Sequence, residues 1–63
     1  MTYDPEADAL RIVLRPAPIA ESGESESGMI FDYDRDGNVV AIEILDASKR
    51  VENPRSVEYA EIG

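Results

Sequence analysis

The sequence contains no cysteine and no histidine, and both absences remove ways of stabilising a short chain. Disulfides cannot form without cysteine, and structural zinc sites are built from cysteine and histidine ligands. A chain of 63 residues buries only about 60% of its unfolded surface, which allows one small core. We therefore expect residues 1–63 to form a single small domain, stabilised as a homodimer that covers exposed strand edges.

Basic residues are few, with 6 lysines and arginines against 14 aspartates and glutamates and a net charge of −8. This charge repels nucleic acid and would attract a basic protein surface, although it also serves solubility alone. No apolar run approaches the roughly 20 residues that span a bilayer, so we expect no membrane segment. The start, MTYDPEADAL, lacks the layout of a signal peptide, which predicts a cytoplasmic protein.

Catalytic signatures are also missing. Histidine and cysteine, the commonest bases and nucleophiles, are absent, and there is no G-x-S-x-G motif or glycine-rich phosphate loop. We therefore predict no catalytic residues, no cofactor and no enzymatic activity.

The clearest positive signal is a β-hairpin over residues 29–46, MIFDYDRDGNVVAIEILD. Asp-Gly between alternating apolar residues favours a two-residue turn at Asp36-Gly37. That turn pairs apolar residues on one face, namely Tyr33 with Val40, Phe31 with Ile42 and Met29 with Ile44. A turn at Gly37-Asn38 would instead set Asp32 opposite Glu43, and a one-residue slip would mix the faces.

The remaining elements are shorter. Residues 9–15 read as a strand with Leu10, Ile12 and Leu14 on one face, ended by Pro16 and Pro18. Residues 21–28 are polar and indicate a loop or a frayed edge strand.

Two segments towards the C-terminus carry helix signals. Residues 47–50 resemble one helical turn capped by Asp46, and Asn53-Pro54 resembles the start of a short helix through Ala60. Residues 54–62 also alternate as a strand would. The predicted fold is mainly β, an antiparallel meander of three to four strands around the 29–46 hairpin with short helical turns near the C-terminus; a small α+β fold is the alternative.

The hairpin carries the only candidate metal ligands, Asp32, Asp34, Asp36 and Glu43. With Gly37 they match D-x-D-x-D-G-x5-E, the spacing of an EF-hand calcium loop. In a strand, however, Asp32 and Asp34 would lie about 7 Å apart, whereas the calcium loop requires its carboxylates to converge. We therefore favour a structural turn, with calcium binding as the alternative function.

The same carboxylates allow a third hypothesis. Asp32, Asp34 and Glu43 share the face opposite the apolar residues, with Asp32 and Glu43 in diagonal contact. Two acids so close could act as an acid/base pair if a cleft enclosed them. We expect instead that Arg11 or Arg15 from the neighbouring strand pairs with these acids. The N-terminal cluster Asp4, Glu6 and Asp8 is interpreted as turn chemistry.

Two segments resemble a small prokaryotic family classified only as a domain of unknown function. They are Y-D-P-E-A-D-A-L-x-I-x-L at residues 3–14 and D-Y-D-x-D-G-N-V-V-x-I-E-I-L-D-A-S at residues 32–48. The resemblance implies a compact, mainly β domain and supplies no catalytic residues. It also suggests an antitoxin-like role, in which an acidic protein binds a basic partner. The small size, the acidic charge and the missing catalytic chemistry make a non-catalytic, self-associating interaction module the leading hypothesis.

Overall fold

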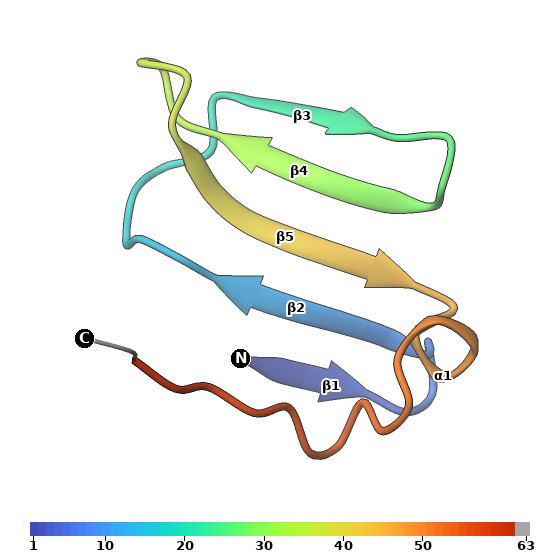
Figure 1. Ribbon diagram of the computed structural model, residues 1–63. Helices are drawn as coiled ribbons and strands as arrows, with labels where there is room; N and C mark the ends of the chain where they lie inside the picture. Colours follow the sequence, from blue (N-terminus) through green and yellow to red (C-terminus); the bar gives the residue numbers. More distant parts are fainter. Residues whose placement is uncertain (62–63) are drawn as a thin grey trace.

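The computed structural model describes residues 1–61 and consists of one antiparallel sheet with one short helix (Figure 1). The strands are β1 (Thr2–Asp4), β2 (Ala9–Val13), β3 (Glu21–Glu24), β4 (Met29–Tyr33) and β5 (Val39–Leu45), and the helix is α1 (Ala47–Arg50). The predicted mainly β, antiparallel class is confirmed, with five strands in the sheet.

The strands lie in the order β1-β2-β5-β4-β3, which is not sequential throughout. A hairpin of β1 and β2 lies beside a meander of β3, β4 and β5, and β2 pairs with β5. The proline-containing link after β2 passes the start of β5, where the Leu14 and Arg15 amides donate to the Val40 carbonyl at 2.7 and 3.3 Å. The link then leads into β3, which confirms the edge-strand interpretation of residues 21–24.

The central hairpin has the predicted register over most of its length. Met29 pairs with Ile44 and Phe31 with Ile42, as the alternation predicts. The prediction for the last pair was wrong, because Tyr33 lies opposite Val39 rather than Val40.

The difference at Tyr33 arises from the turn. The Asp34 amide donates to the Asn38 carbonyl, and the Gly37 amide donates to the Asp34 carbonyl, which makes a three-residue loop rather than the two-residue turn expected. Gly37 closes this loop at φ 84°, the left-handed conformation that glycine adopts without strain. The register shift beside Asp32 and Tyr33 leaves Val40 as the extra residue of a β-bulge, which restores the register from Asp32 to Met29.

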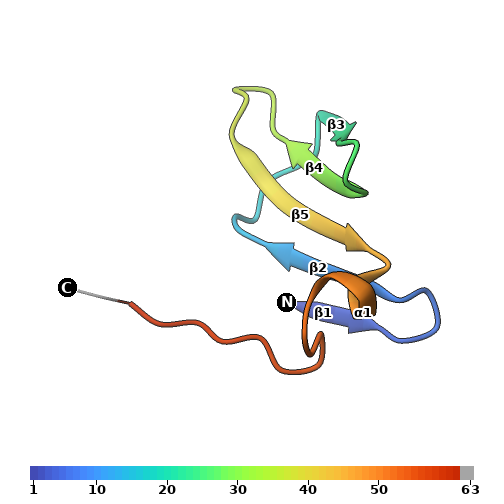
Figure 2. The same ribbon diagram turned by 45° about the vertical axis from the view of Figure 1, so that its right-hand side comes forward.

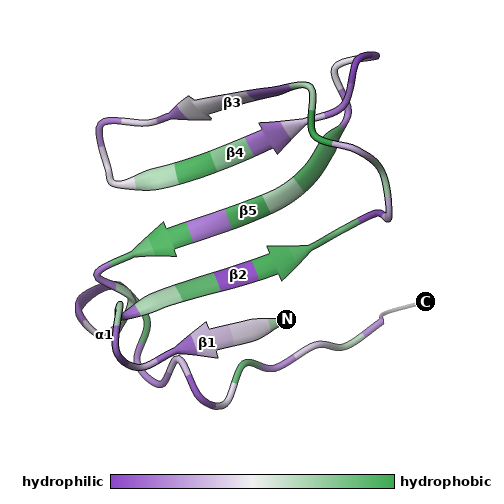
Figure 3. Cartoon of the chain, turned by 180° about the vertical axis from the view of Figure 1, so that it is seen from behind, coloured by the Kyte–Doolittle hydropathy of each residue, from purple (hydrophilic) through white to green (hydrophobic). Residues whose placement is uncertain are grey.

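The core of this sheet is small. Among the described residues, the buried apolar side chains are Leu10, Val40, Ala41 and Ala47. No described helix or strand lies over the middle of the sheet, so the molecule is a single layer with extents of 33 × 32 × 19 Å (Figures 1 and 2). Hydrophobic residues are concentrated in β2, β4 and β5, whereas β1 and β3 are mainly hydrophilic (Figure 3). Within residues 1–61, no helix is long and apolar enough to cross a membrane.

The predicted helical turn at residues 47–50 is confirmed, but its predicted cap was wrong. Asp46 has left-handed backbone angles (φ 53°) and makes no capping side-chain hydrogen bond. The cap comes instead from Asp8, whose carbonyl accepts from the Ala47 amide at 2.9 Å. Helix α1 therefore lies against the β1–β2 turn, at one end of the sheet (Figure 2).

The predicted helix after Asn53 was also wrong. The Asn53 side chain accepts from the Arg55 amide at 3.1 Å and its carbonyl accepts from the Ser56 amide at 3.1 Å, which makes a turn. Residues 56–61 continue without regular secondary structure, and residue 62 of the predicted segment lies outside the described residues. Too few apolar side chains from this segment reach the sheet to hold a helix there, since Val57 and Tyr59 are both exposed.

Candidate functional site

The four candidate calcium ligands lie in two places. Asp34 and Asp36 belong to the hairpin loop, whereas Asp32 lies in β4 and Glu43 in β5. Asp32 and Glu43 share one face of the sheet, because Asp32 pairs with Ala41 and side chains two residues apart along a strand point the same way. The hairpin therefore separates the candidate ligands into a loop pair and a sheet pair.

Asp32 is the one buried ionisable residue of the described chain, with only 5% of its surface exposed. Its Oδ1 accepts a 2.6 Å hydrogen bond from the Ser22 hydroxyl of β3, and its Oδ2 lies 3.4 Å from Nη1 of Arg11 in β2. These partners reach Asp32 from both sides of β4. The predicted pairing of Arg11 with an acid of the hairpin is confirmed.

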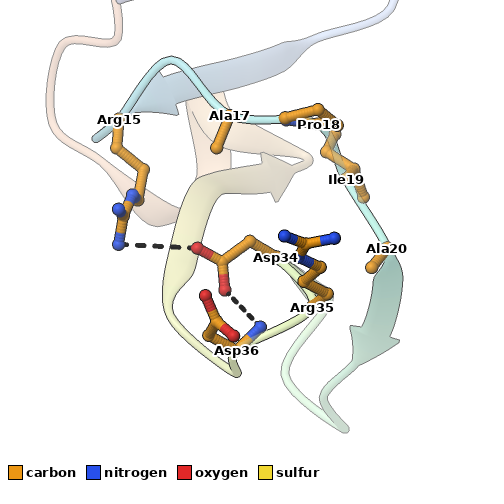
Figure 4. Close-up of a pocket in the computed structure, with 8 residues that line it drawn as sticks. All are labelled: Arg15, Ala17, Pro18, Ile19, Ala20, Asp34, Arg35 and Asp36. Atoms are coloured by element: carbon orange, nitrogen blue, oxygen red, sulfur yellow. Dashed lines mark hydrogen bonds and ion pairs between the residues drawn. The ribbon is translucent and has the colours of Figure 1, made fainter.

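Asp34 organises the loop through its carboxylate. Its Oδ1 accepts the backbone amides of Asp36 and Asn38, both at 2.9 Å, and its Oδ2 accepts the Asn38 side-chain amide at 3.3 Å. These hydrogen bonds, led by the Asn38 backbone amide, lower the pKa of Asp34 below its ordinary value. Arg15 lies 3.5 Å from Asp34, which confirms the second predicted arginine pair (Figure 4).

The other two candidate ligands are Asp36 and Glu43. Asp36 is exposed, and Glu43 lies directly opposite Arg11 in the β2–β5 register. No group of three or more histidine, cysteine, aspartate or glutamate residues in the described part of the chain is placed to hold a metal ion. Calcium binding at these four residues stays a prediction, and Asp32 and Asp34 already have protein partners.

A hollow of about 530 Å³ lies between the link after β2 and the hairpin loop (Figure 4). Its lining consists of Arg15, Ala17, Pro18, Ile19, Ala20, Asp34, Arg35 and Asp36. Asp34 points from the loop towards Arg15, so these two of the four charged lining residues neutralise each other. Neither Asp32 nor Glu43 lines this hollow, so it does not provide the cleft that acid/base chemistry at those residues would require.

A second carboxylate centre, at Asp8, was interpreted from the sequence only as part of a turn. Its Oδ1 accepts the Tyr3 hydroxyl at 2.7 Å and the Ser48 amide at 3.0 Å, and its Oδ2 accepts the Ser48 hydroxyl at 2.7 Å. These bonds, with the Ser48 hydroxyl first and Tyr3 second, lower the pKa of Asp8. The same hydrogen bond to Asp8 raises the pKa of Tyr3 above its ordinary value.

The chemistry around Asp8 is structural. The carboxylate joins the β1–β2 turn to α1, and its acceptor sites are occupied by groups of the same chain. The nearby Asp4 behaves as predicted, because its Oδ1 accepts the Glu6 and Ala7 amides and forms the turn. The only sequence signal for the Asp8 centre is the residue type, since its helix partner lies 40 positions away.

Comparison with known proteins identifies a family. The sequence model of a family described as "Protein of unknown function (DUF2283)" matches residues 1–48. The matched part contains all five strands and ends at Ser48, so it includes the Asp8 centre and the hairpin. No curated protein and no solved structure matches the chain significantly.

Proposed function

The chain belongs to the DUF2283 family, whose function is uncharacterised, and we propose that it is a non-catalytic interaction module that associates with a second copy of itself. The observation that carries this proposal is the core. Of the buried apolar side chains in residues 1–61, only Leu10 and Val40 are larger than alanine. Small domains with so little buried surface usually need disulfides, a metal or a partner, and this chain has no cysteine.

The carboxylates of the chain support the non-catalytic part of the proposal. Asp8, Asp32 and Asp34 each accept hydrogen bonds from groups that hold neighbouring segments together. A general acid or base must reach a substrate proton, and a carboxylate saturated by structural donors is poorly placed to do so. These residues therefore stabilise the fold, which favours an interaction module over an enzyme.

Sedimentation equilibrium of the full chain tests self-association. A dimer has twice the 6.9 kDa mass of the monomer, and the proposal predicts that the dimer dominates at high protein concentration. A mass of 6.9 kDa at every concentration up to the solubility limit would contradict it.

The charge supports a second property of the module, binding of a basic protein in the manner of an antitoxin. The chain carries a net charge of −8, and exposed acids extend along its surface. They include Glu21, Glu24, Glu26, Glu52 and Glu58. Such a surface accelerates encounter with a basic protein and makes the association sensitive to salt.

Co-purification from cells tests the partner proposal. A basic protein should be recovered in stoichiometric amount at low ionic strength and be lost at high ionic strength. A Glu21→Gln, Glu24→Gln variant should recover less of it, whereas a Ser25→Ala variant in the same region keeps the charge and serves as the matched control. Recovery of no stoichiometric basic protein at low salt overturns the antitoxin-like role and leaves self-association standing.

A further inference from the structure

The two faces of the sheet differ in character. On one face, two cross-strand rows run over β2, β5 and β4: Ile12, Ile42 and Phe31 in one, and Leu10, Ile44 and Met29 in the other. Leu10 is buried, whereas the other five are only partly buried. We call these five residues, Ile12, Met29, Phe31, Ile42 and Ile44, the apolar face.

The opposite face carries charge in its centre. Arg11, Asp32 and Glu43 lie there, with Arg11 paired to Asp32 and directly opposite Glu43. Because each copy carries a net charge of −8, two copies repel one another wherever acidic surface meets acidic surface. The apolar face is the part of the sheet at which they can approach with no charged side chain in either row.

The chain exposes more surface than a compact protein of its size. A compact monomer of 6.9 kDa exposes about 4,000 Å², whereas this chain exposes 4962 Å². The open sheet and the exposed segment after α1 both contribute to the difference of about 1,000 Å². A stable interface buries about 800 Å² on each partner, so one such contact would bring the surface close to that of a compact protein.

The strand edges are less suited to a second copy. Edge strand β3 carries Glu21 and Glu24 at its two ends, so antiparallel pairing of β3 with its own copy would set glutamate opposite glutamate. The other edge, β1, has only three residues, and the Arg55 guanidinium stacks 5.4 Å from the centre of the Tyr3 ring there. Both edges therefore carry features that oppose or hinder continuous strand addition.

We infer that the apolar face is the self-association surface, and that its occupant is the same face of a second copy related by a two-fold axis. The two sheets then form a two-layer β-sandwich with the side chains of the two rows interdigitating between them. This inference rests on the proposed self-association and replaces the strand edges with the sheet face as its site. Phe31 is the largest side chain of the face, and its partner in β3 is Gly23, which has no side chain to cover it.

The absence of cysteine provides a direct test, because a single introduced thiol is the only one in the chain. We would introduce it by Ile42→Cys on the apolar face and, as a matched control one residue away on the opposite face, by Glu43→Cys. The labelling rate of each thiol by a maleimide is measured at low and high protein concentration. Circular dichroism establishes that each variant is folded, and Ile12→Cys replaces Ile42→Cys if the central substitution prevents folding.

The inference predicts that concentrating the protein slows labelling at position 42 by at least about tenfold, in step with dimer formation, because association buries that thiol. Labelling at position 43 should change by less than about twofold. A dimer in which position 42 labels as fast as in the monomer overturns the inference and leaves self-association intact, as does a dimer that protects position 43 instead. A wild-type chain that remains a monomer overturns both.

Discussion

Ser48 donates both its backbone amide and its hydroxyl to the carboxylate of Asp8, at 3.0 and 2.7 Å, across 40 residues of sequence. Asp8 thereby performs the capping function expected of Asp46, although it belongs to the turn between β1 and β2. Its own backbone is left-handed (φ 52°), which turns the chain so that carbonyl and carboxylate both reach α1. The contact joins α1, which follows β5, to the hairpin of β1 and β2.

Removing the Asp8 charge should weaken this tie in a pH-dependent way. The pKa of Asp8 is lowered in the folded chain, chiefly by the Ser48 hydroxyl, so its stabilisation is present above the unfolded value of about 3.9 and is lost as pH falls below it. We predict that Asp8→Asn lowers the melting temperature at pH 7 by several degrees and makes the loss of stability below pH 4 less steep.

The loss of stability at acid pH, which we call the acid limb, should not vanish in that variant. The pKa of Asp34 is also lowered in the folded chain, so protonation of Asp34 at low pH destabilises the fold as well. Glu6→Gln is the control, since Glu6 is exposed in the same turn. Melting curves of the three proteins between about pH 3 and pH 7 give the comparison. Equal acid limbs in wild type and Asp8→Asn would show that the Ser48 contact does not stabilise the fold.

The conformation of Gly37 predicts a contrast between two glycines. Gly37 has φ 84°, and Gly23 does not have a positive φ, yet neither would meet an atom within 4 Å if it carried a Cβ. Gly37→Ala should therefore destabilise the chain by about 1 kcal/mol through backbone strain alone, while Gly23→Ala should be neutral or slightly stabilising. Urea denaturation of both variants measures the difference. Equal effects would mean that the loop does not require a left-handed residue at position 37.

The pair of Arg11 and Asp32 should contribute modestly to stability. Although Asp32 is buried, the Arg11 side chain is 37% exposed, so water screens the interaction. A double-mutant cycle of Arg11→Gln and Asp32→Asn should give a coupling free energy of about 0.5–1 kcal/mol that falls with added salt. Arg35→Gln, in the exposed loop, controls for the change in net charge. A coupling of zero at low salt would show that Ser22 alone satisfies Asp32.

The sequence predicts the strand pairing of the hairpin but not the details of its turn. The pairs Phe31–Ile42 and Met29–Ile44 follow from alternation, because slipping the register by one residue would move every apolar side chain to the charged face. The alternation does not predict the partner of Tyr33. A three-residue loop with a bulge and a two-residue loop without a bulge give the same pairs at Phe31 and Met29, so those pairs do not distinguish the two loops.

The candidate site was predictable in composition and only partly in geometry. The arginine partners of Asp32 and Asp34 follow from the sequence alternation of residues 9–15, which sets Arg11 and Arg15 opposite the apolar residues. The Asp8–Ser48 contact could not be predicted, since local capping rules favour the adjacent Asp46. The helix expected after Asn53 failed because a proline-initiated pattern needs packed apolar side chains to persist.

Calcium binding at Asp32, Asp34, Asp36 and Glu43 makes a thermodynamic prediction of its own. An ion bound by the folded chain raises the melting temperature by mass action. Because Asp32 and Asp34 already accept hydrogen bonds, we expect about 1 mM calcium to change the melting temperature no more than the same concentration of magnesium. A calcium-specific increase that Asp36→Asn abolishes would establish the site instead.

The most direct test of the central claim, that association covers the apolar face and so stabilises a fold with a small core, is the melting temperature of the full chain as a function of its own concentration. Folding coupled to dimerisation makes the melting temperature rise with protein concentration. We predict a rise of several degrees over about a hundredfold range, with Phe31→Thr flattening it and Ser25→Ala leaving it unchanged. A melting temperature that is independent of concentration in the wild-type chain would contradict the account.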